Sequence, residues 1–224
     1  MYNEALYDHL MEQPDADRIV ARAAEQLQRE AKARREFREW LTPSIKAEFI
    51  NGEIIVHSPA RRGHLVAGGN LYKLLNLYAS VHELGEVYTE KALVEMGRND
   101  FEPDVGFWRN EQATDWTDET TVFPPPTLVV EVLSKTTEAR DRGIKFQSYL
   151  AHEVPEYWIV DTRKQRIEQY VLRIDGDDTP HYDLRSRYHG EQLLECQAIP
   201  GLQFPAAVAF SDARSLSWVR DLLG

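Results

Sequence analysis

The chain has 224 residues, enough for one large domain or two small ones, and its 26 lysines and arginines against 37 aspartates and glutamates give a formal net charge of -11. This charge excludes a general attraction for nucleic acid or anionic membrane, so a polyanionic partner would need a locally basic surface or a metal ion. The single cysteine, Cys196, excludes an internal disulfide and a cysteine-rich zinc site, and we expect a cytoplasmic protein with no membrane segment.

The first predicted element is a charged helix over residues 15–40. Ala, Glu, Gln and Arg dominate it, and Glu/Arg pairs at helical spacing recur along it. Its apolar stripe is thin and comprises Ile19, Ala23, Leu27, Ala31 and Phe37. A helix of this length needs packing to be stable, so we expect residues 1–43 to be a helical extension that braces a homodimer. Residues 44–224 would then form the main domain.

From residue 46 onward, helices and strands alternate. The Asn-Gly dipeptide at 51–52, between two apolar runs, predicts a β-hairpin, and leucine spacing predicts a helix over 63–84. The later segments predict strands over 86–96, 103–109, 127–133, 156–161, 166–173 and 182–197, a loop over 110–126 and a helix over roughly 138–152. This order predicts a mixed β-sheet flanked by helices, of the α+β or α/β class, with any site at the seam between the early helix and the central strands.

A carboxylate interrupts the most apolar of these strands. Glu131 lies within the run from Leu128 to Leu133, and alternation along the strand places it on one face with Val129. Such strands are usually covered on both faces, so an ionised carboxylate there needs a partner. Asp104 begins another apolar strand, and two facing acids on neighbouring strands would repel each other unless a divalent cation lay between them. An edge position or an ion pair with Lys or Arg are the alternative interpretations.

Four segments resemble, in order and spacing, the Uma-two family of restriction-endonuclease-like proteins, which is grouped with the PD-(D/E)XK nuclease superfamily. These segments are INGEIIVHSPARRGH, PDVGFW, LVVEVLSKTT and DRGIKFQSYLAHEVPEYWIVD, and the similarity covers roughly residues 44–175. The resemblance implies a restriction-endonuclease-like core and Mg²⁺- or Mn²⁺-dependent cleavage of phosphodiester bonds in nucleic acid, with DNA the expected substrate. Asp104 and Glu131 match the two metal-binding acids of the motif.

The resemblance also assigns a catalytic lysine. The usual superfamily lysine would fall at position 133, where this chain has Leu133. The family instead uses a lysine on the following helix, which would be Lys145. Lys135 is the alternative, because the chain reads SKTT where relatives commonly read SPST.

Further site residues are implied around this pair. His64 matches a family histidine that could contact a scissile phosphate or a water molecule. Glu53 matches the acid of the family's Gly-Glu pair and would be a further metal-side acid, with Glu48 a second candidate. Arg61 and Arg62 could bind backbone phosphates. A capping histidine, solvated hairpin acids and a solvated arginine pair are the alternatives, and Asp141 and Gln147 flank Lys145 as supporting candidates.

Two functions of different class follow. The first is a metal-dependent endonuclease. The second is a catalytically inactive protein of the same fold that acts as a binding or assembly module, which the charge of -11 favours because duplex binding draws on many Lys and Arg contacts. A third interpretation places Glu131 in a purely structural ion pair.

Overall fold

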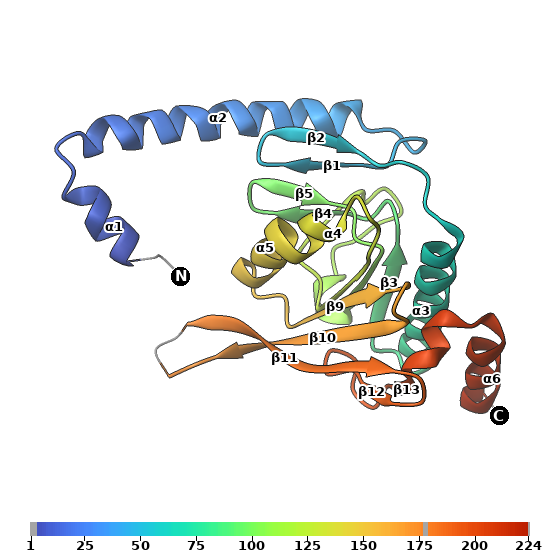
Figure 1. The fold of residues 1–224 in the computed structure, drawn as a ribbon. Coiled ribbons are helices and arrows are strands. Elements are labelled where there is room, and N and C mark those ends of the chain that lie inside the picture. Colours follow the sequence, from blue (N-terminus) through green and yellow to red (C-terminus); the bar gives the residue numbers. More distant parts are fainter. Residues whose placement is uncertain (1–3, 177–178, 224) are drawn as a thin grey trace.

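The charged helix predicted at the N-terminus lies along one edge of the computed structural model, which describes residues 4–176 and 179–223 (Figure 1). α1 spans Glu4–Met11 and α2 spans Ala16–Trp40. The last turns of α2 lie over the first hairpin, where Phe37 is buried with its ring centroid 5.7 Å from that of Phe49. The first half of α2 extends past the β1–β2 hairpin and, together with α1, forms a projecting arm (Figure 1).

The predicted hairpin is confirmed. β1 spans Ala47–Ile50 and β2 spans Glu53–Val56. Asn51 and Gly52 between them have φ values of 51° and 88°, the left-handed conformation that a two-residue type I′ turn requires. The hairpin belongs to a five-stranded sheet of order β2-β1-β5-β4-β7. The other members are β4 (Leu93–Met96), β5 (Asn99–Phe101) and β7 (Val122–Phe123).

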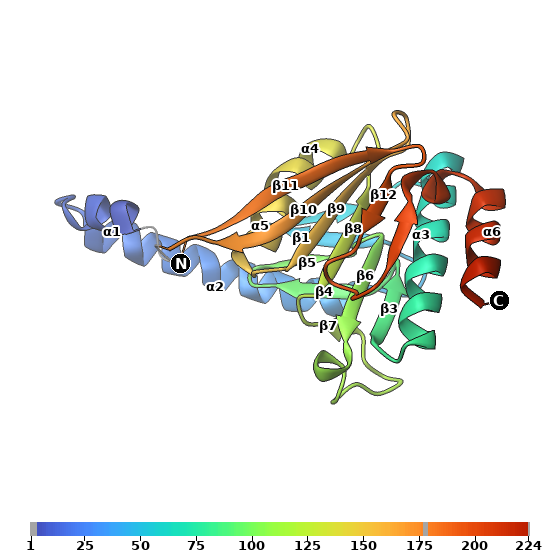
Figure 2. The ribbon, with the colours of Figure 1, turned by 90° about the horizontal axis from the view of Figure 1, so that it is seen from below.

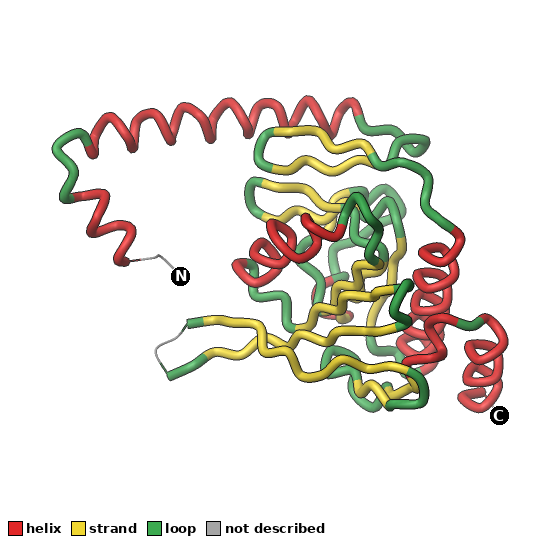
Figure 3. Tube along the Cα trace, in the orientation of Figure 1, coloured by secondary structure: helices red, strands yellow, loops and turns green. Residues whose placement is uncertain are grey.

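A second sheet has six strands in the order β11-β10-β9-β8-β6-β3 (Figure 2). Its strands are among those drawn in yellow in Figure 3. Its strands are β3 (Gly85–Thr89), β6 (Val105–Arg109), β8 (Leu128–Val132), β9 (Glu156–Asp161), β10 (Arg166–Ile174) and β11 (Pro180–His189). β8 and β9 run parallel, and the other neighbours run antiparallel. The sheet is therefore mixed, as predicted.

The segment 86–96, predicted as one strand, divides between the two sheets. Glu90 and Lys91 interrupt it with φ values of 39° and 64°, which is uncommon for residues other than glycine. β3 therefore ends at Thr89, and β4 begins at Leu93 in the other sheet. Nothing in the local composition signalled this turn, so the prediction of a single strand was wrong.

Helices cover both faces of the six-stranded sheet. α3 (Arg62–Val81) packs on one face, and the predicted 138–152 helix packs on the other as α4 (Glu138–Arg140), the π-helical turn η2 (Asp141–Lys145) and α5 (Phe146–Ala151). The remaining elements are η1 (Asn110–Gln112), β12 (Leu193–Glu195), β13 (Gln203–Pro205), η3 (Ala206–Phe210) and α6 (Asp212–Leu223).

The side-chain alternation predicted for β8 is also confirmed. Leu128, Val130 and Val132 lie in the core that α3 covers, whereas Val129 and Leu133 lie in the core on the opposite face. Glu131 therefore points toward the α4–α5 side of the sheet. None of the helices in the described part of the chain combines the length and the apolar character that crossing a membrane requires.

Candidate functional site

The two acids singled out in the sequence come from neighbouring strands. β6 and β8 pair with Val105 opposite Val130, so Asp104, directly before β6, lies beside the end of β8. Its Oδ2 accepts a hydrogen bond of 2.8 Å from the backbone N–H of Val132. Asp104 and Glu131 are only 6% and 3% exposed. Two buried carboxylates therefore meet at the carboxyl end of β8.

Lys145 supplies the cation that contacts Glu131. It lies in the π-helical turn η2, a feature that often marks functional sites, and it is 2% exposed. Its Nζ is 2.7 Å from Oε1 of Glu131 and 2.6 Å from Oε1 of Glu48. Lys135 is exposed, and within the described residues it has neither an ion pair nor a hydrogen bond. The structure thus brings Lys145, and not Lys135, to the acids.

Two further side chains of the same helical segment face this ion pair. The hydroxyl of Tyr149 donates a hydrogen bond of 2.8 Å to Oε1 of Glu131, and Oδ1 of Asp141 lies 3.8 Å from Nζ of Lys145. The spacing of four residues between 141, 145 and 149 places all three on one helical face. Sequence reasoning did not single out Tyr149, although this spacing was the available signal. Gln147, the other supporting candidate, is exposed.

The hairpin contributes Glu48 to this site, and not Glu53. Both lie on the same face of the hairpin, since Glu48 is opposite Ile55 and Glu53 is opposite Ile50. Glu48 is fully buried, binds Lys145 and lies 3.1 Å from Nε2 of His57. Glu53 is exposed next to the turn, and its side chain makes no hydrogen bond or ion pair within the described chain. The structure therefore does not bring Glu53 to Asp104 and Glu131, because only the inner end of the hairpin reaches the sheet interface.

His64 reaches Asp104 from the first turn of α3. Its Nε2 lies 3.1 Å from Oδ1 of Asp104, and Nζ of Lys46 lies 3.3 Å from the same oxygen. Burial alone would raise the pKa of Asp104, but the hydrogen bond to His64 and the charge of Lys46 lower it to about 2. Conversely, burial disfavours the charged imidazole, but the contact with Asp104 outweighs it and raises the pKa of His64. Sequence reasoning missed Lys46.

The backbone of Asp104 is fixed from the turn that separates the two sheets. The hydroxyl of Thr89 donates a hydrogen bond of 2.7 Å to the carbonyl of Asp104, immediately before the left-handed pair Glu90 and Lys91. The Lys91 ammonium in turn donates to the carbonyl of Ile45. This turn therefore ties the start of β6 to the start of the hairpin, and positions Asp104.

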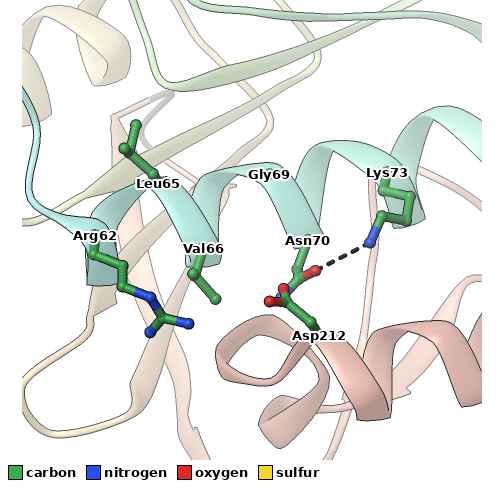
Figure 4. Close-up of a pocket in the computed structure, with 7 residues that line it drawn as sticks. All are labelled: Arg62, Leu65, Val66, Gly69, Asn70, Lys73 and Asp212. Atoms are coloured by element: carbon green, nitrogen blue, oxygen red, sulfur yellow. Dashed lines mark hydrogen bonds between the residues drawn. The ribbon is translucent and has the colours of Figure 1, made fainter.

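Arg61 and Arg62 lie at the start of α3, and both are exposed. Arg62 lines a hollow of about 320 Å³ between α3 and α6, together with Lys73 and Asp212 (Figure 4). Neither Asp104 nor Glu131 lines this hollow. The structure therefore leaves Arg62 on the α6 side of α3, whereas His64 of the same turn reaches the acids.

Negative charge exceeds positive charge in the buried site. Glu48, Glu131 and Asp141 surround Lys145, and Asp104 pairs with Lys46, a second ammonium at the margin. Burial raises the pKa of Glu131 to about 8; Lys145 opposes this rise, and the neighbouring acids reinforce it. In Glu48, by contrast, Lys145 and His57 outweigh burial and lower the pKa to about 2. One ammonium thus serves several acids, and Glu131 is left undercompensated.

A further buried acid lies beside this cluster. Glu102, two residues before Asp104, is 1% exposed, and neither of its carboxylate oxygens has a hydrogen-bond partner among the described residues. Burial raises its pKa to about 7, although the charges of Lys91 and Lys46 oppose the rise. Sequence reasoning took only the aspartate from the segment FEPD and missed Glu102.

The donor set is of the kind that a hard divalent cation prefers. Mg²⁺ takes one or two protein carboxylates and completes its shell with water and phosphate oxygens. The hydrogen bonds of Lys145 and Tyr149 to Glu131 both end on Oε1, so neither of them occupies Oε2. Within the described residues no three His, Cys, Asp or Glu side chains group at metal-binding distances. Asp104 and Glu131 are therefore the two carboxylates that could hold such an ion.

Comparison with known proteins gives a family match over most of the chain. The family model described as "Uma2: Putative restriction endonuclease" matches residues 34–209. "Uncharacterized protein sll1609" of Synechocystis sp. (strain ATCC 27184 / PCC 6803 / Kazusa) is 31% identical over 159 residues, which is 67% of this chain and 80% of that protein. "Uncharacterized protein slr1290" of the same organism is 40% identical over 87 residues, 38% of this chain, and the match spans 42% of its own length.

A solved structure shares the fold. It is described as "Crystal structure of a putative nuclease belonging to DUF820 from Anabaena variabilis ATCC 29413" and superposes with a TM-score of 0.62 at 14% sequence identity. The match covers 75% of this chain and 90% of that one. The mixed α/β fold predicted from the sequence is confirmed by this likeness.

Proposed function

Since the chain belongs to the Uma2 family, described as "Putative restriction endonuclease", we propose that it is a Mg²⁺- or Mn²⁺-dependent nuclease that hydrolyses phosphodiester bonds of nucleic acid, with DNA as the first substrate to test. One observation carries the proposal. Asp104 and Glu131 are buried side by side at the ends of neighbouring strands, and Lys145 contacts Glu131 at 2.7 Å. This is an acid pair with an adjacent ammonium, and its negative charge is only partly offset.

The three residues have distinct roles in this proposal. Asp104 and Glu131 would hold the divalent cation, which when bound supplies Lewis-acid polarisation of a phosphoryl oxygen. The Lys145 ammonium stabilises negative charge that develops on the phosphate, and its effect is strengthened because the surroundings are buried. Tyr149 donates to the same oxygen of Glu131 as Lys145, so it holds that carboxylate in one orientation.

His64 has a positioning role and a proton to exchange. Its Nε2 is held by Asp104, while its Nδ1 is buried and has no hydrogen-bond partner among the described residues. In the neutral ring with the proton on Nε2, Nδ1 is a proton acceptor, and the contact with Asp104 raises the pKa of the ring. We propose that His64 orients Asp104 through Nε2 and accepts a proton from water at Nδ1.

The alternative is a catalytically inactive protein of the same fold. The charge of -11 favours it, and the buried Lys145–Glu131 pair could be structural. A purely structural pair, however, needs one acid for each ammonium. Here Glu48, Glu131 and Asp141 share one ammonium, and Glu102 has no partner among the described residues. This excess of carboxylates favours the nuclease.

For assembly, we propose that residues 1–43 are an extension of the 44–224 domain and that they join two copies of the chain. α1 has no buried residue, and in α2 only Glu30 and Phe37 are buried. Val20 and Leu27 in the projecting half of α2 are each 49% exposed. A helix of this composition needs packing for stability, and a second copy of the arm offers the same apolar stripe.

The cleavage test uses the full-length chain. Labelled DNA duplex, single-stranded DNA and RNA would be incubated with Mg²⁺, with Mn²⁺ and with EDTA. Cleavage in the metal conditions that stops in EDTA and in Asp104→Asn supports the nuclease. Absence of cleavage of all three substrates in both metals would favour the inactive module.

A further inference from the structure

Three segments of the chain adjoin one another at the end of the sheet that carries Glu131. The first is the start of α3, where a Cβ at Gly63 would lie 3.8 Å from the side chain of Thr162 in the β9–β10 turn. The second is the β9–β10 turn itself, which contacts the start of α4 because Nη2 of Arg163 is 2.7 Å from Oε2 of Glu138. The third is the segment from β8 to α4, held to the sheet by a hydrogen bond from the N–H of Leu133 to the carbonyl of Val160. The start of α3, the β8–α4 segment and the β9–β10 turn therefore surround one end of the site.

The acids of these segments are already neutralised. Glu138 lies 2.7 Å from Arg163 and 3.4 Å from Arg142. Asp161 is buried and lies 3.3 Å from Nε of Arg163, and it accepts hydrogen bonds from the backbone N–H groups of residues 163 and 164. The carboxylates here therefore leave little negative charge free to pair with other cations.

Besides Arg62, which lines the hollow between α3 and α6, these segments carry three cations with no acid partner in the described chain and a fourth, Lys164, with one long contact. Arg61 and Lys135 are exposed and unpaired, and the Lys164 side chain is 62% exposed and 3.9 Å from Asp161. Arg140 is half-buried, and its Nε is fully buried without an acceptor. It directly precedes Asp141, whose carboxylate faces Lys145. Each of the three segments thus contributes at least one available cation.

Among these cations, Arg140 gives the clearest indication of an anion-binding site. A buried donor without an acceptor is unfavourable, and an anion bound there would remove that cost. A guanidinium also presents a fork of N–H groups that matches the oxygens of a phosphate. Elsewhere in the α4 region, Arg142 already has this kind of partner in the carboxylate of Glu168, at 2.8 and 3.0 Å. The unmet guanidinium of Arg140 is therefore suited to an external anion.

We propose that Arg61, Lys135, Arg140 and Lys164 form a basic rim that binds the phosphodiester backbone of the nucleic acid and holds one phosphate over Asp104 and Glu131. This inference rests on the proposed nuclease function and deepens it. The cations come from separate segments around the acid cluster, so they suit a chain of evenly spaced phosphates better than one isolated anion. The rim also explains how a chain of net charge -11 could bind a polyanion.

The binding test uses the full-length protein in EDTA with a short fluorescent DNA duplex, followed by anisotropy between about 50 and 200 mM salt. The double variant Lys135→Ala/Arg140→Ala should bind at least about tenfold more weakly, and its log-log salt slope should fall by about one unit for each phosphate that the protein no longer neutralises. The matched control is Arg22→Ala/Arg173→Ala, two exposed arginines on α2 and β10 with the same loss of charge. The control should bind as the wild type does. If Arg140→Ala does not fold, Lys135→Glu at an exposed position provides the same test.

Separate outcomes distinguish the rim from the chemistry. Cleavage of bis(p-nitrophenyl) phosphate in Mn²⁺ requires the acids and Lys145 but no polymer backbone, so it tests the nuclease alone. If the wild type cleaves this ester while the rim and control variants bind duplex equally well, the proposed rim is wrong and the proposed nuclease function is supported. If the rim variants bind weakly while Asp104→Asn leaves ester cleavage unchanged, the proposed rim is supported and the proposed nuclease function is contradicted. The rim would be overturned if the wild type bound no duplex. It would also be overturned if polyglutamate, added as a competitor, displaced the labelled duplex as readily as unlabelled duplex does.

Discussion

Nζ of Lys145 lies 2.7 Å from Oε1 of Glu131, and both side chains are buried. The carboxylate in the middle of an apolar strand is therefore matched by an ammonium from the helix that follows that strand. The same ammonium is 2.6 Å from Glu48 in the other sheet, so it also links the two sheets. Whether this link has a catalytic or only a structural role can be tested.

Lysine exchange separates the two candidate residues. Lys145→Ala should remove at least about 100-fold of the nuclease rate, because it deletes the buried charge that stabilises the phosphate. Lys135→Ala should cost less than about tenfold, the effect of one backbone contact. Single-turnover cleavage of a labelled duplex in Mn²⁺ measures both. Because losing one partner of a buried ion pair can cost about 3–5 kcal/mol, circular dichroism must first show that Lys145→Ala is folded. The reverse order of effects would assign the role to Lys135, and equally small effects would favour the inactive module.

The two hairpin glutamates provide a matched pair for stability. Glu48→Gln weakens a buried contact with Lys145, so the melting temperature should fall by several degrees, about 2–4 °C for each kcal/mol lost. Glu53→Gln changes an exposed side chain and should alter stability by less than about 0.5 kcal/mol. Thermal melts compare the melting temperatures of the two variants with that of the wild type. A larger loss in Glu53→Gln would contradict the placement of the hairpin.

Glu102 predicts a pH dependence of stability. Its pKa of about 7 lies above the ordinary carboxyl value of 4.5, so the folded chain binds more protons than the unfolded chain between these pH values. The free energy of unfolding should therefore decrease as the pH rises from about 4.5 to 7. Glu102→Gln removes this contribution, and at pH 8 it should be more stable than wild type by about 1–3 kcal/mol. Urea titrations at pH 5 and pH 8 measure the difference. If Glu102→Gln were instead less stable than the wild type by the same amount at both pH values, Glu102 would have a stabilising partner.

The projecting arm predicts a change in oligomeric state. Val20→Glu/Leu27→Glu places charge on the exposed apolar stripe and should convert a dimer to a monomer. Arg22→Glu lies on the opposite face of α2 and should leave the dimer intact. Multi-angle light scattering gives the mass of each. These substitutions are preferable to a chain that starts at Ser44, which would also remove Phe37 from its contact with Phe49. Wild type that elutes as a monomer at high concentration would reject the dimer.

Much of the fold was predictable because the decisive signals are local. The Asn-Gly pair sets its own turn, and the continuous apolar run of β8 reports burial on both faces. The division of residues 86–96 between two sheets was not predictable, because it depends on a left-handed turn at Glu90 and Lys91, which have no special preference for it.

The site was predictable only in part for a related reason. Asp104, Glu131 and Lys145 stand out because each is a charge in an apolar element or a motif. Glu48 and Lys46 stand in no unusual local pattern, and they reach the site only because the hairpin packs against β8 and α5. Contacts between residues so far apart in sequence are fixed by tertiary packing, which periodicity does not report.

The central claim is that Asp104 and Glu131 together hold a divalent cation, and calorimetric titration with Mn²⁺ tests it most directly. Wild type should release or absorb measurable heat at millimolar Mn²⁺ with about one ion bound per chain. Asp104→Ala and Glu131→Ala should each abolish that heat, and circular dichroism must first show that each variant is folded, because each acid has buried partners that the substitution removes. Glu53→Ala, at the exposed end of the hairpin, should titrate as the wild type does. No heat in the wild type, or unchanged binding in both acid variants, would contradict the account.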